Sequence, residues 1–291
     1  MRNAAGNLAL AGYADIFNVG TSENEQIVEI DLHELFPPEF HPFQLSNDEA
    51  MERLVESVKQ YGVREPGLAR KRAGGGYELI CGNRRKMACE LAGITSMPVI
   101  VRELDDDSAA IAMVDSNLQQ REKILPSEKA WAYRIKMEAL NHNGVKGECR
   151  SFEIMMSQTG DSKNQIFRLI RLTELIAVLI DKVDAHQLAF NPAVELSYLS
   201  VAEQTAVAEA MSRFEVKPSL SQAQRLKQMK QDGTLSAEII DAILAEDKKP
   251  PKGEASGTAR FRKFFPSDYS PKQIEAVIIG LLRTWRENQS G

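Results

Sequence analysis

The sequence has few of the residues that build metal centres or disulfide frameworks. Its 291 residues include three cysteines and four histidines. Cys81, Cys89 and Cys149 do not have the paired spacing of zinc ligands, and their odd number does not suit a disulfide framework. The sequence therefore argues against a zinc module or a disulfide-stapled secreted fold, and we expect reduced thiols in an intracellular protein.

The chain also lacks a long apolar run and an overall basic charge. No stretch approaches the roughly 20 apolar residues of a membrane-spanning helix, and the first residues lack the basic and apolar regions of a signal peptide. The net charge is −5, but residues 64–86 hold seven Lys and Arg against two Glu, and residues 217–230 hold four basic residues and no acid. We therefore expect a cytoplasmic protein without a membrane span, in which local patches meet any anionic partner.

Strand and helix patterns divide the chain into two main parts. Strands alternate with helices in the first part and only helices follow, which predicts an α/β domain and then an all-α domain, mainly helical overall. We expect a flexible tail at residues 1–26, the α/β domain at 27–122, the all-α domain at 123–246, a linker at 247–258 and a C-terminal helical segment at 259–291.

The C-terminal segment ends in a strongly amphipathic helix. Its apolar side carries Ile274, Val277, Ile278, Leu281, Leu282 and Trp285. So strong a stripe on a short segment needs a covering surface, which is either this chain or a second copy of it. We favour the homodimer.

Residues 77–103 combine a strand, a glycine turn and a basic helix start. Gly82 ends the apolar run, and we expect Asn83 to cap a helix whose first turn carries Arg84 and Arg85. A helix start has unpaired N–H groups and a positive dipole end, so the two arginines add charge where an anion already binds well. The pattern predicts a phosphate site, and a capped helix with two solvated arginines is the alternative.

Residues 150–172 have the pattern of a helix-turn-helix. Gly160 permits the turn, Ser162 is a cap for the second helix, and the apolar residues Ile166 and Leu169 follow the glycine by six and nine positions. Asn and Arg side chains read base edges, whereas Lys and Ser mainly hold phosphate. A solvated polar face is the alternative to a DNA-binding face with the contact residues Thr159, Ser162, Lys163, Asn164, Arg168 and Arg171.

In this order the motifs resemble those of the ParB family of DNA-partition proteins. The segment ICGNRRKMA at residues 80–88 resembles the family's GERR box, and NLQQREKILPSEKA at 117–130 resembles its ENxQRE box. HPF at 41–43 is similar to the element before the family's first helix. The resemblance spans about residues 27–200 and implies a ParB-like nucleotide-binding domain followed by a helix-turn-helix DNA-binding domain.

The resemblance also implies a function. Family members bind a palindromic, centromere-like site on double-stranded DNA, use CTP with Mg²⁺ as a switch to form a sliding clamp as a homodimer, and work with a ParA-type ATPase on the nucleoid or a plasmid. By this resemblance Gly82, Asn83, Arg84 and Arg85 bind the triphosphate. Asn117 would contact the nucleotide and serve as the metal ligand.

Two departures from the family pattern remove acids from this region. Asn83 stands where the family has the Glu of GERR, and Ser116 stands where it has the Glu before the metal-binding Asn. We therefore expect CTP binding with at most weak CTPase turnover, and Asp115 is a candidate replacement for the missing carboxylate. One extra residue also separates Asn117 from Pro126.

Two other classes of protein stay open. A helix-turn-helix transcription regulator or nucleoid-associated protein would bind DNA without nucleotide switching. A nuclease or phosphoryl-transfer enzyme would need carboxylates around a metal, and residues 103–107 contain such a run of acids. Because this run precedes a helix that we expect to begin at Ser108, capping charge is the simpler explanation.

Overall fold

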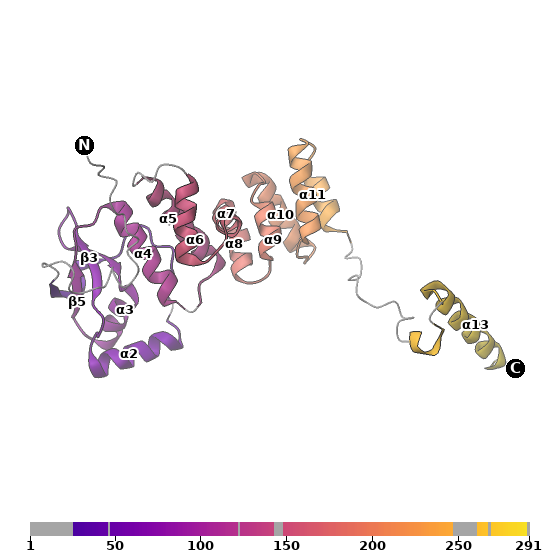
Figure 1. Cartoon of the computed structure of the whole chain (residues 1–291), viewed down its shortest axis with the longest axis horizontal. Coiled ribbons are helices and arrows are strands. Elements are labelled where there is room, and N and C mark those ends of the chain that lie inside the picture. The colour runs from indigo at the N-terminus through magenta and orange to yellow at the C-terminus, as the bar shows by residue number, and fades with distance from the viewer. Residues whose placement is uncertain are drawn as a thin grey trace. The chain divides into compact units, whose positions relative to one another are not determined.

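The structure, a computed structural model, describes residues 26–45, 47–121, 123–142, 148–246, 261–266 and 269–289. It separates into two compact units, Met1–Leu244 and Ala245–Gly291. The first unit begins with an α/β part and continues with helices only, so the predicted fold class is confirmed (Figure 1). The tail predicted at residues 1–26, apart from Gln26, and the linker predicted at 247–258 lie outside the described residues.

A five-stranded sheet organises the α/β part, in the order β1-β5-β3-β4-β2. The pairs β1–β5 and β3–β4 are antiparallel, whereas β3–β5 and β2–β4 are parallel. The strands are β1 (Ile27–Asp31), β2 (Leu35–Phe36), β3 (Gly67–Lys71), β4 (Tyr77–Cys81) and β5 (Ser96–Val101), with a 3₁₀ turn η1 (Leu32–Glu34) between the first two.

Both faces of this sheet are covered, because alternate side chains of a strand point to opposite faces. On one face Leu68, Ile80 and Ile100 pack with α4 (Asp106–Gln120). The other face packs against α2 (Glu49–Tyr61) and α3 (Asn83–Ala92), through the buried residues Leu79, Met97, Val99, Met51, Val58 and Ala88. Helix α3 therefore starts directly from the end of a buried strand.

Two helix starts differ from the prediction. Asn83 does not cap α3: Gly82 occupies the N-cap position, and the side-chain amide of Asn83 donates to the carbonyl of Leu79 at 3.4 Å. Helix α4 begins before Ser108, because the Asp105 carboxylate accepts a hydrogen bond from the Ser108 amide at 2.7 Å. This hydrogen bonding lowers the pKa of Asp105, so the acidic run does act as capping charge.

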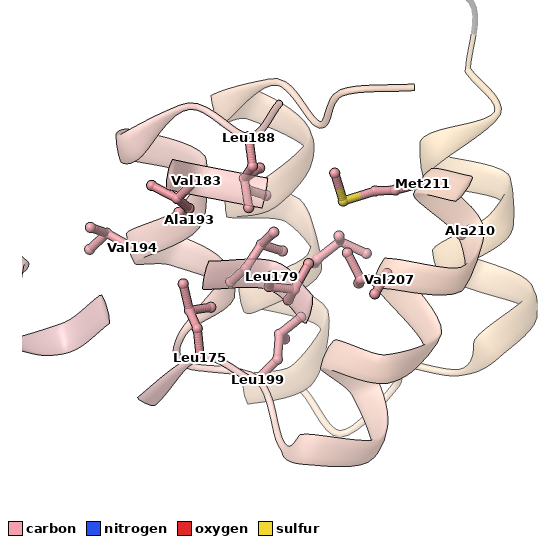
Figure 2. Packing of buried hydrophobic residues seen from close by; sticks show 14 of the residues in the cluster. Leu175, Leu179, Val183, Leu188, Ala193, Val194, Leu199, Val207, Ala210 and Met211 are labelled. Carbon is pink, nitrogen blue, oxygen red and sulfur yellow. The ribbon is translucent and has the colours of Figure 1, made fainter. Parts of the chain in front are cut away.

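The helical part follows at once. It comprises α5 (Pro126–His142), α6 (Glu148–Thr159), α7 (Lys163–Arg171), a 3₁₀ turn η2 (Leu172–Glu174), α8 (Ala177–Asp184), α9 (Phe190–Leu196), α10 (Val201–Arg213), α11 (Leu220–Gln231) and α12 (Ala237–Leu244). Figure 2 shows side chains from α8, α9 and α10, among them Leu179, Val194 and Val207, in one buried cluster. Helices α11 and α12 complete this core with Leu226 and Ile243.

The basic run at residues 217–230 is used within this helical core. Lys217 donates to the carbonyl of His186 at 3.2 Å. Lys227 pairs with Glu195 at 2.8 Å, and Lys230 donates to the carbonyl of Tyr198. These hydrogen bonds tie α11 and the turn before it to neighbouring segments.

The second unit contains a 3₁₀ turn η4 (Arg262–Phe264) and the long helix α13 (Pro271–Gln289). Ile274 is buried, whereas Leu281 and Trp285 are 66% and 62% exposed. Most of the predicted apolar stripe is therefore exposed, namely Val277, Leu281, Leu282 and Trp285. Across the described residues, no helix is both long enough and apolar enough to cross a membrane.

Candidate functional site

A cavity of about 680 Å³ lies at the start of α3. Its walls come from the loop before α2, the first turn of α2, the β4–α3 turn and the end of α4. The structure brings into this cavity all the residues predicted to bind nucleotide, namely Gly82, Asn83, Arg84, Arg85 and Asn117. Segments that are far apart in the sequence thus meet around one space.

Gly82 sets the geometry of the cavity floor. Its φ is +110°, which side-chain-bearing residues rarely adopt. A Cβ at this position would also lie 3.2 Å from the Cα of Gly67. The tight turn lets α3 begin at the cavity, so the positive end of the helix dipole and the first N–H groups are placed there for an anion.

The two predicted arginines are held differently. Arg84 forms an ion pair with Asp48 at 3.3 Å, and both side chains are partly exposed. Arg85 donates to the backbone carbonyls of Glu65 and Pro66 at 2.5 and 2.6 Å. Arg85 is therefore fixed to the backbone, whereas the partner of Arg84 is a side chain that a bound anion can replace.

Arg121 also lines the cavity, and our sequence-based assignment of the site missed it. Its side chain is 14% exposed, lies 3.5 Å from the Glu128 carboxylate and donates to the carbonyl of Gln44 at 3.2 Å. Within the described part of the chain its buried Nε has no hydrogen-bond partner. Burial lowers the pKa of Arg121, the Glu128 charge opposes this effect, and the charge of Arg84 adds to it. The signal for this residue was present in the NLQQRE motif, whereas nothing in the sequence singled out Arg53, which lines the same cavity.

The wall formed by α4 is poor in acids. The side-chain amide of Asn117 donates to the carbonyl of Met113 at 2.9 Å, which leaves its own carbonyl oxygen for a ligand. Ser116 is buried and lines the cavity. Asp115 does not line it but pairs with the buried Lys136 of α5. The expectation that Asp115 replaces the missing carboxylate is therefore wrong, because successive helix residues point in different directions and this one faces α5.

The second candidate site lies at α6 and α7. Gly160 has a φ of +73° with open space around it. The Ser162 hydroxyl accepts a hydrogen bond from the amide of Gln165 at 3.3 Å, and Ile166 and Leu169 are buried. The helix, turn, cap and inward positions thus lie where the sequence pattern predicted them, and use of these helices on DNA stays a prediction.

The predicted DNA-contact residues separate into two groups. Ser162, Lys163 and Asn164 are exposed at the start of α7. Thr159 is half-buried, and its hydroxyl donates to the carbonyl of Met155 at 2.8 Å. Phe167 is 48% exposed on the same helix and was missed because the sequence argument considered only polar residues.

Arg168 and Arg171 require a correction, because the sequence placed both on the exposed side of α7. Both are half-buried. Arg168 donates to the side-chain oxygen of Asn191, and Arg171 donates to the carbonyl of Ser197 at 2.5 Å. These contacts fix α7 against α9 and its C-terminal end.

Helix α5 connects the two candidate sites. Near its start, Glu128 accepts a hydrogen bond from the amide of Gln44 at 2.7 Å, beside the cavity. The next residue, Lys129, and Tyr133 one turn further along bind the Asp161 carboxylate in the α6–α7 turn at 2.8 and 2.5 Å. Burial opposes ionisation of Asp161, but these two hydrogen bonds outweigh it and lower the pKa of the carboxyl.

Comparison with known proteins identifies the α/β part. Residues 18–118 match the family model of the ParB N-terminal domain. Stage 0 sporulation protein J of Bacillus subtilis is 34% identical over 172 residues, which cover 58% of this chain and 57% of that protein. A nucleoid occlusion protein of Listeria monocytogenes is 28% identical over 193 residues, which cover 65% of this chain and 63% of that protein. The chain thus spans about three fifths of the length of these relatives.

Solved structures of the C-terminally truncated chromosome-partitioning protein ParB from Caulobacter crescentus are also similar. The complex with the centromeric parS site is 22% identical with a TM-score of 0.42 and covers 75% of this chain and 98% of that chain. The complex with CTP-gamma-S is 24% identical with a TM-score of 0.31 and covers 64% of this chain and 99% of that chain. Because residues 18–118 match the model of the ParB N-terminal domain, the chain carries this domain and is related through it to the ParB family.

Proposed function

We propose that this chain is a sequence-specific DNA-binding partition protein, in which CTP bound at the start of α3 switches the protein into a sliding clamp. The cavity is the observation that carries the proposal. Residues from separate segments of a ParB N-terminal domain line it, and Arg84, Arg85 and Arg121 give it positive charge. Its volume of about 680 Å³ is within the range of small-molecule sites.

The triphosphate would lie at the helix start. Backbone N–H groups, the helix dipole and the forked guanidinium groups of Arg84 and Arg85 all favour phosphate oxygens. The choice of CTP among nucleotides rests on the family resemblance. The same resemblance implies Mg²⁺ at Asn117, whose carbonyl oxygen is a legitimate but neutral ligand.

Double-stranded DNA would bind at the exposed start of α7. Lys163 and Ser162 suit phosphate contacts, and Asn164 suits a base edge in the major groove. The apolar ring of Phe167 suits the methyl group of thymine. Arg168 and Arg171 would then act mainly by holding α7 in position through α9.

A homodimer would match a palindromic, centromere-like site, because two copies of α7 related by a two-fold axis meet two half-sites. The exposed apolar side of α13, with Leu281 and Trp285, suits such self-association. A ParA-type ATPase as partner, and a place on the nucleoid or on a plasmid, follow from the family resemblance.

The second candidate function is DNA binding without nucleotide switching, as in a regulator or nucleoid-associated protein. The similarity to a nucleoid occlusion protein of Listeria monocytogenes suits a role at the nucleoid. An enzyme ranks last. Among the acids at residues 103–107, Asp105 caps α4 and Asp106 pairs with Arg70 at 2.7 Å, and Asp115 is engaged by Lys136.

A nucleotide titration tests the proposal. Full-length protein is titrated with CTP, ATP, GTP and UTP by calorimetry, with and without candidate palindromic DNA and with Mg²⁺ present. We expect binding of CTP alone, strengthened by the cognate DNA. Absence of binding for every nucleotide under both conditions would replace the partition clamp with the second candidate function.

A further inference from the structure

The donor groups of the cavity do not suit a bound Mg²⁺ ion. This ion is usually held by one or two carboxylates together with phosphate oxygens and water. Around Asn117, the neighbouring Ser116 contributes a buried hydroxyl, and Asp115 is turned away to Lys136. Across the α3 start, Asn83 contributes an amide that is bonded to the carbonyl of Leu79. Neither place where the family carries an acid supplies one here.

Two of the three acids that line the cavity are engaged by other groups. Asp48 caps α2 through the amide of Met51 at 2.9 Å and pairs with Arg84. Glu49 pairs with Arg53 at 2.7 Å. Of the residues that the structure describes, no three of the types His, Cys, Asp and Glu gather as a metal site. On α4 the cavity thus offers the neutral oxygens of Ser116 and Asn117, where the ion would need charged ligands.

Positive charge, by contrast, is present in excess. Arg53, Arg84, Arg85, Arg121 and Lys123 line the cavity with the acids Asp48, Glu49 and Glu65. Arg121 is the most informative of these residues, because its side chain is only 14% exposed and lines the same cavity as Arg84. The like charges of the two guanidinium groups repel each other, which adds to the lowering of the pKa of Arg121 by burial. A phosphate placed between the two groups would relieve this repulsion.

We infer that Arg84 and Arg121 balance the charge of the triphosphate in this chain, so that CTP binds without a divalent cation. The inference rests on the proposed function and refines it. In this arrangement the guanidinium groups take the part that a metal ion plays where carboxylates are available. Arginine suits this role because it stays charged at every physiological pH and offers a fork of donors to phosphate.

The test compares CTP affinity of the full-length protein in excess Mg²⁺ and in excess EDTA, by calorimetry at one ionic strength. We expect the two dissociation constants to agree within about twofold. A loss of about tenfold or more in EDTA would overturn the inference and leave the proposed function intact. Absence of CTP binding in both buffers would overturn the proposed function itself.

Two substitutions test the role of Arg121. Arg121→Gln should weaken CTP binding in EDTA by about tenfold or more, and Arg121→Lys should restore part of it by restoring the charge. Arg64→Gln is the matched control, because Arg64 is exposed and does not line the cavity. Equal losses for Arg121→Gln and Arg64→Gln, in variants that melt at the temperature of the unmodified protein, would contradict the assignment.

A third substitution restores an acid. Asn83→Glu places a carboxylate in the first turn of α3, where a helix tolerates it well. Because this carboxylate repels phosphate unless a cation lies between them, CTP affinity of the variant should fall in EDTA and recover in Mg²⁺. If the CTP affinity of this variant were the same in EDTA and in Mg²⁺, the missing acids would not explain why CTP binds without a metal ion.

Discussion

Gly82 and Gly160 mark two helix starts that look alike in the sequence and differ in the structure. Each glycine has a positive φ and precedes a helix whose first turn is basic, with Arg84, Arg85 and Lys86 in α3 and Lys163 in α7. Gly82 approaches the backbone of Gly67, and its helix opens into a cavity. Gly160 has open space around it, and its helix presents Lys163 and Asn164 on an exposed face.

The difference lies in what surrounds each helix start, and it decides which ligand fits. At α3 the surrounding segments converge on a small space, so charge is concentrated and partly removed from water, which suits a compact anion. At α7 the same kinds of residue lie on an exposed helix face, which suits the extended groove of a nucleic acid. Each local motif supplies hydrogen-bond donors at a helix start, and the segments around that start determine how large a ligand can bind there.

Paired substitutions of the two glycines should produce the largest effect. Gly82→Ala adds a Cβ at a positive φ and against Gly67, so we expect the free energy of unfolding to fall by about 3 kcal/mol and CTP binding to be lost. In Gly160→Ala the new Cβ has open space, so only the positive φ is unfavourable, and the free energy of unfolding should fall by about 1–2 kcal/mol. Urea unfolding of both variants provides the measurement. Equal destabilisation would show that the close approach at Gly82 has no energetic weight.

Removing a guanidinium group from the cavity should have the next largest effect. Arg84→Ala should weaken CTP binding by about 1.5–3 kcal/mol, the usual loss for a hydrogen bond to a charged group, and leave site-specific DNA binding intact. Lys86→Ala is the control on the same helix, because Lys86 donates to the carbonyl of Leu35 at 2.6 Å and does not line the cavity. Calorimetry and gel-shift assays on folded protein measure the two activities. If Arg84→Ala weakened CTP binding and DNA binding equally, the assignment of these two activities to separate sites would be wrong.

On the exposed face, two neighbouring residues should change DNA binding in different ways. Asn164→Ala should reduce discrimination between the cognate site and random DNA by about 1–3 kcal/mol, because a base-edge contact is lost. Lys163→Ala should weaken binding to both DNAs alike and lower the salt dependence, because a phosphate contact is lost. Fluorescence anisotropy on both DNAs over a range of salt distinguishes these outcomes. The same change from both variants would argue against α7 as the helix that reads sequence.

Much of this structure could be predicted from local sequence signals, and two of the failures, at Asp115 and Arg171, share one physical cause. The strand before Gly82, the turn at Gly160 and the inward positions Ile166 and Leu169 each depend on a few neighbouring residues. Asp115 and Arg171 were misjudged because their partners, Lys136 and Ser197, are more than twenty residues away in the sequence. Long-range pairing of polar side chains leaves no periodic signal in the chain.

The smallest predicted effect concerns Asp48, which links the cavity to the start of α2. Its carboxylate both caps α2 and pairs with Arg84, so a bound phosphate must compete with it. Asp48→Asn keeps a good cap and removes the charge, so thermal stability should stay unchanged while CTP binding tightens by up to about 1 kcal/mol, since partly exposed ion pairs are weak. Asp105→Asn makes the same change at the N-cap of α4. Because Asp105 does not line the cavity, this variant should bind CTP as tightly as the unmodified protein. If Asp48→Asn weakened CTP binding instead, Asp48 would be positioning Arg84 for the phosphate. The start of α3 would then depend on the neighbouring segments for the orientation of Arg84 as well as for the shape of the cavity.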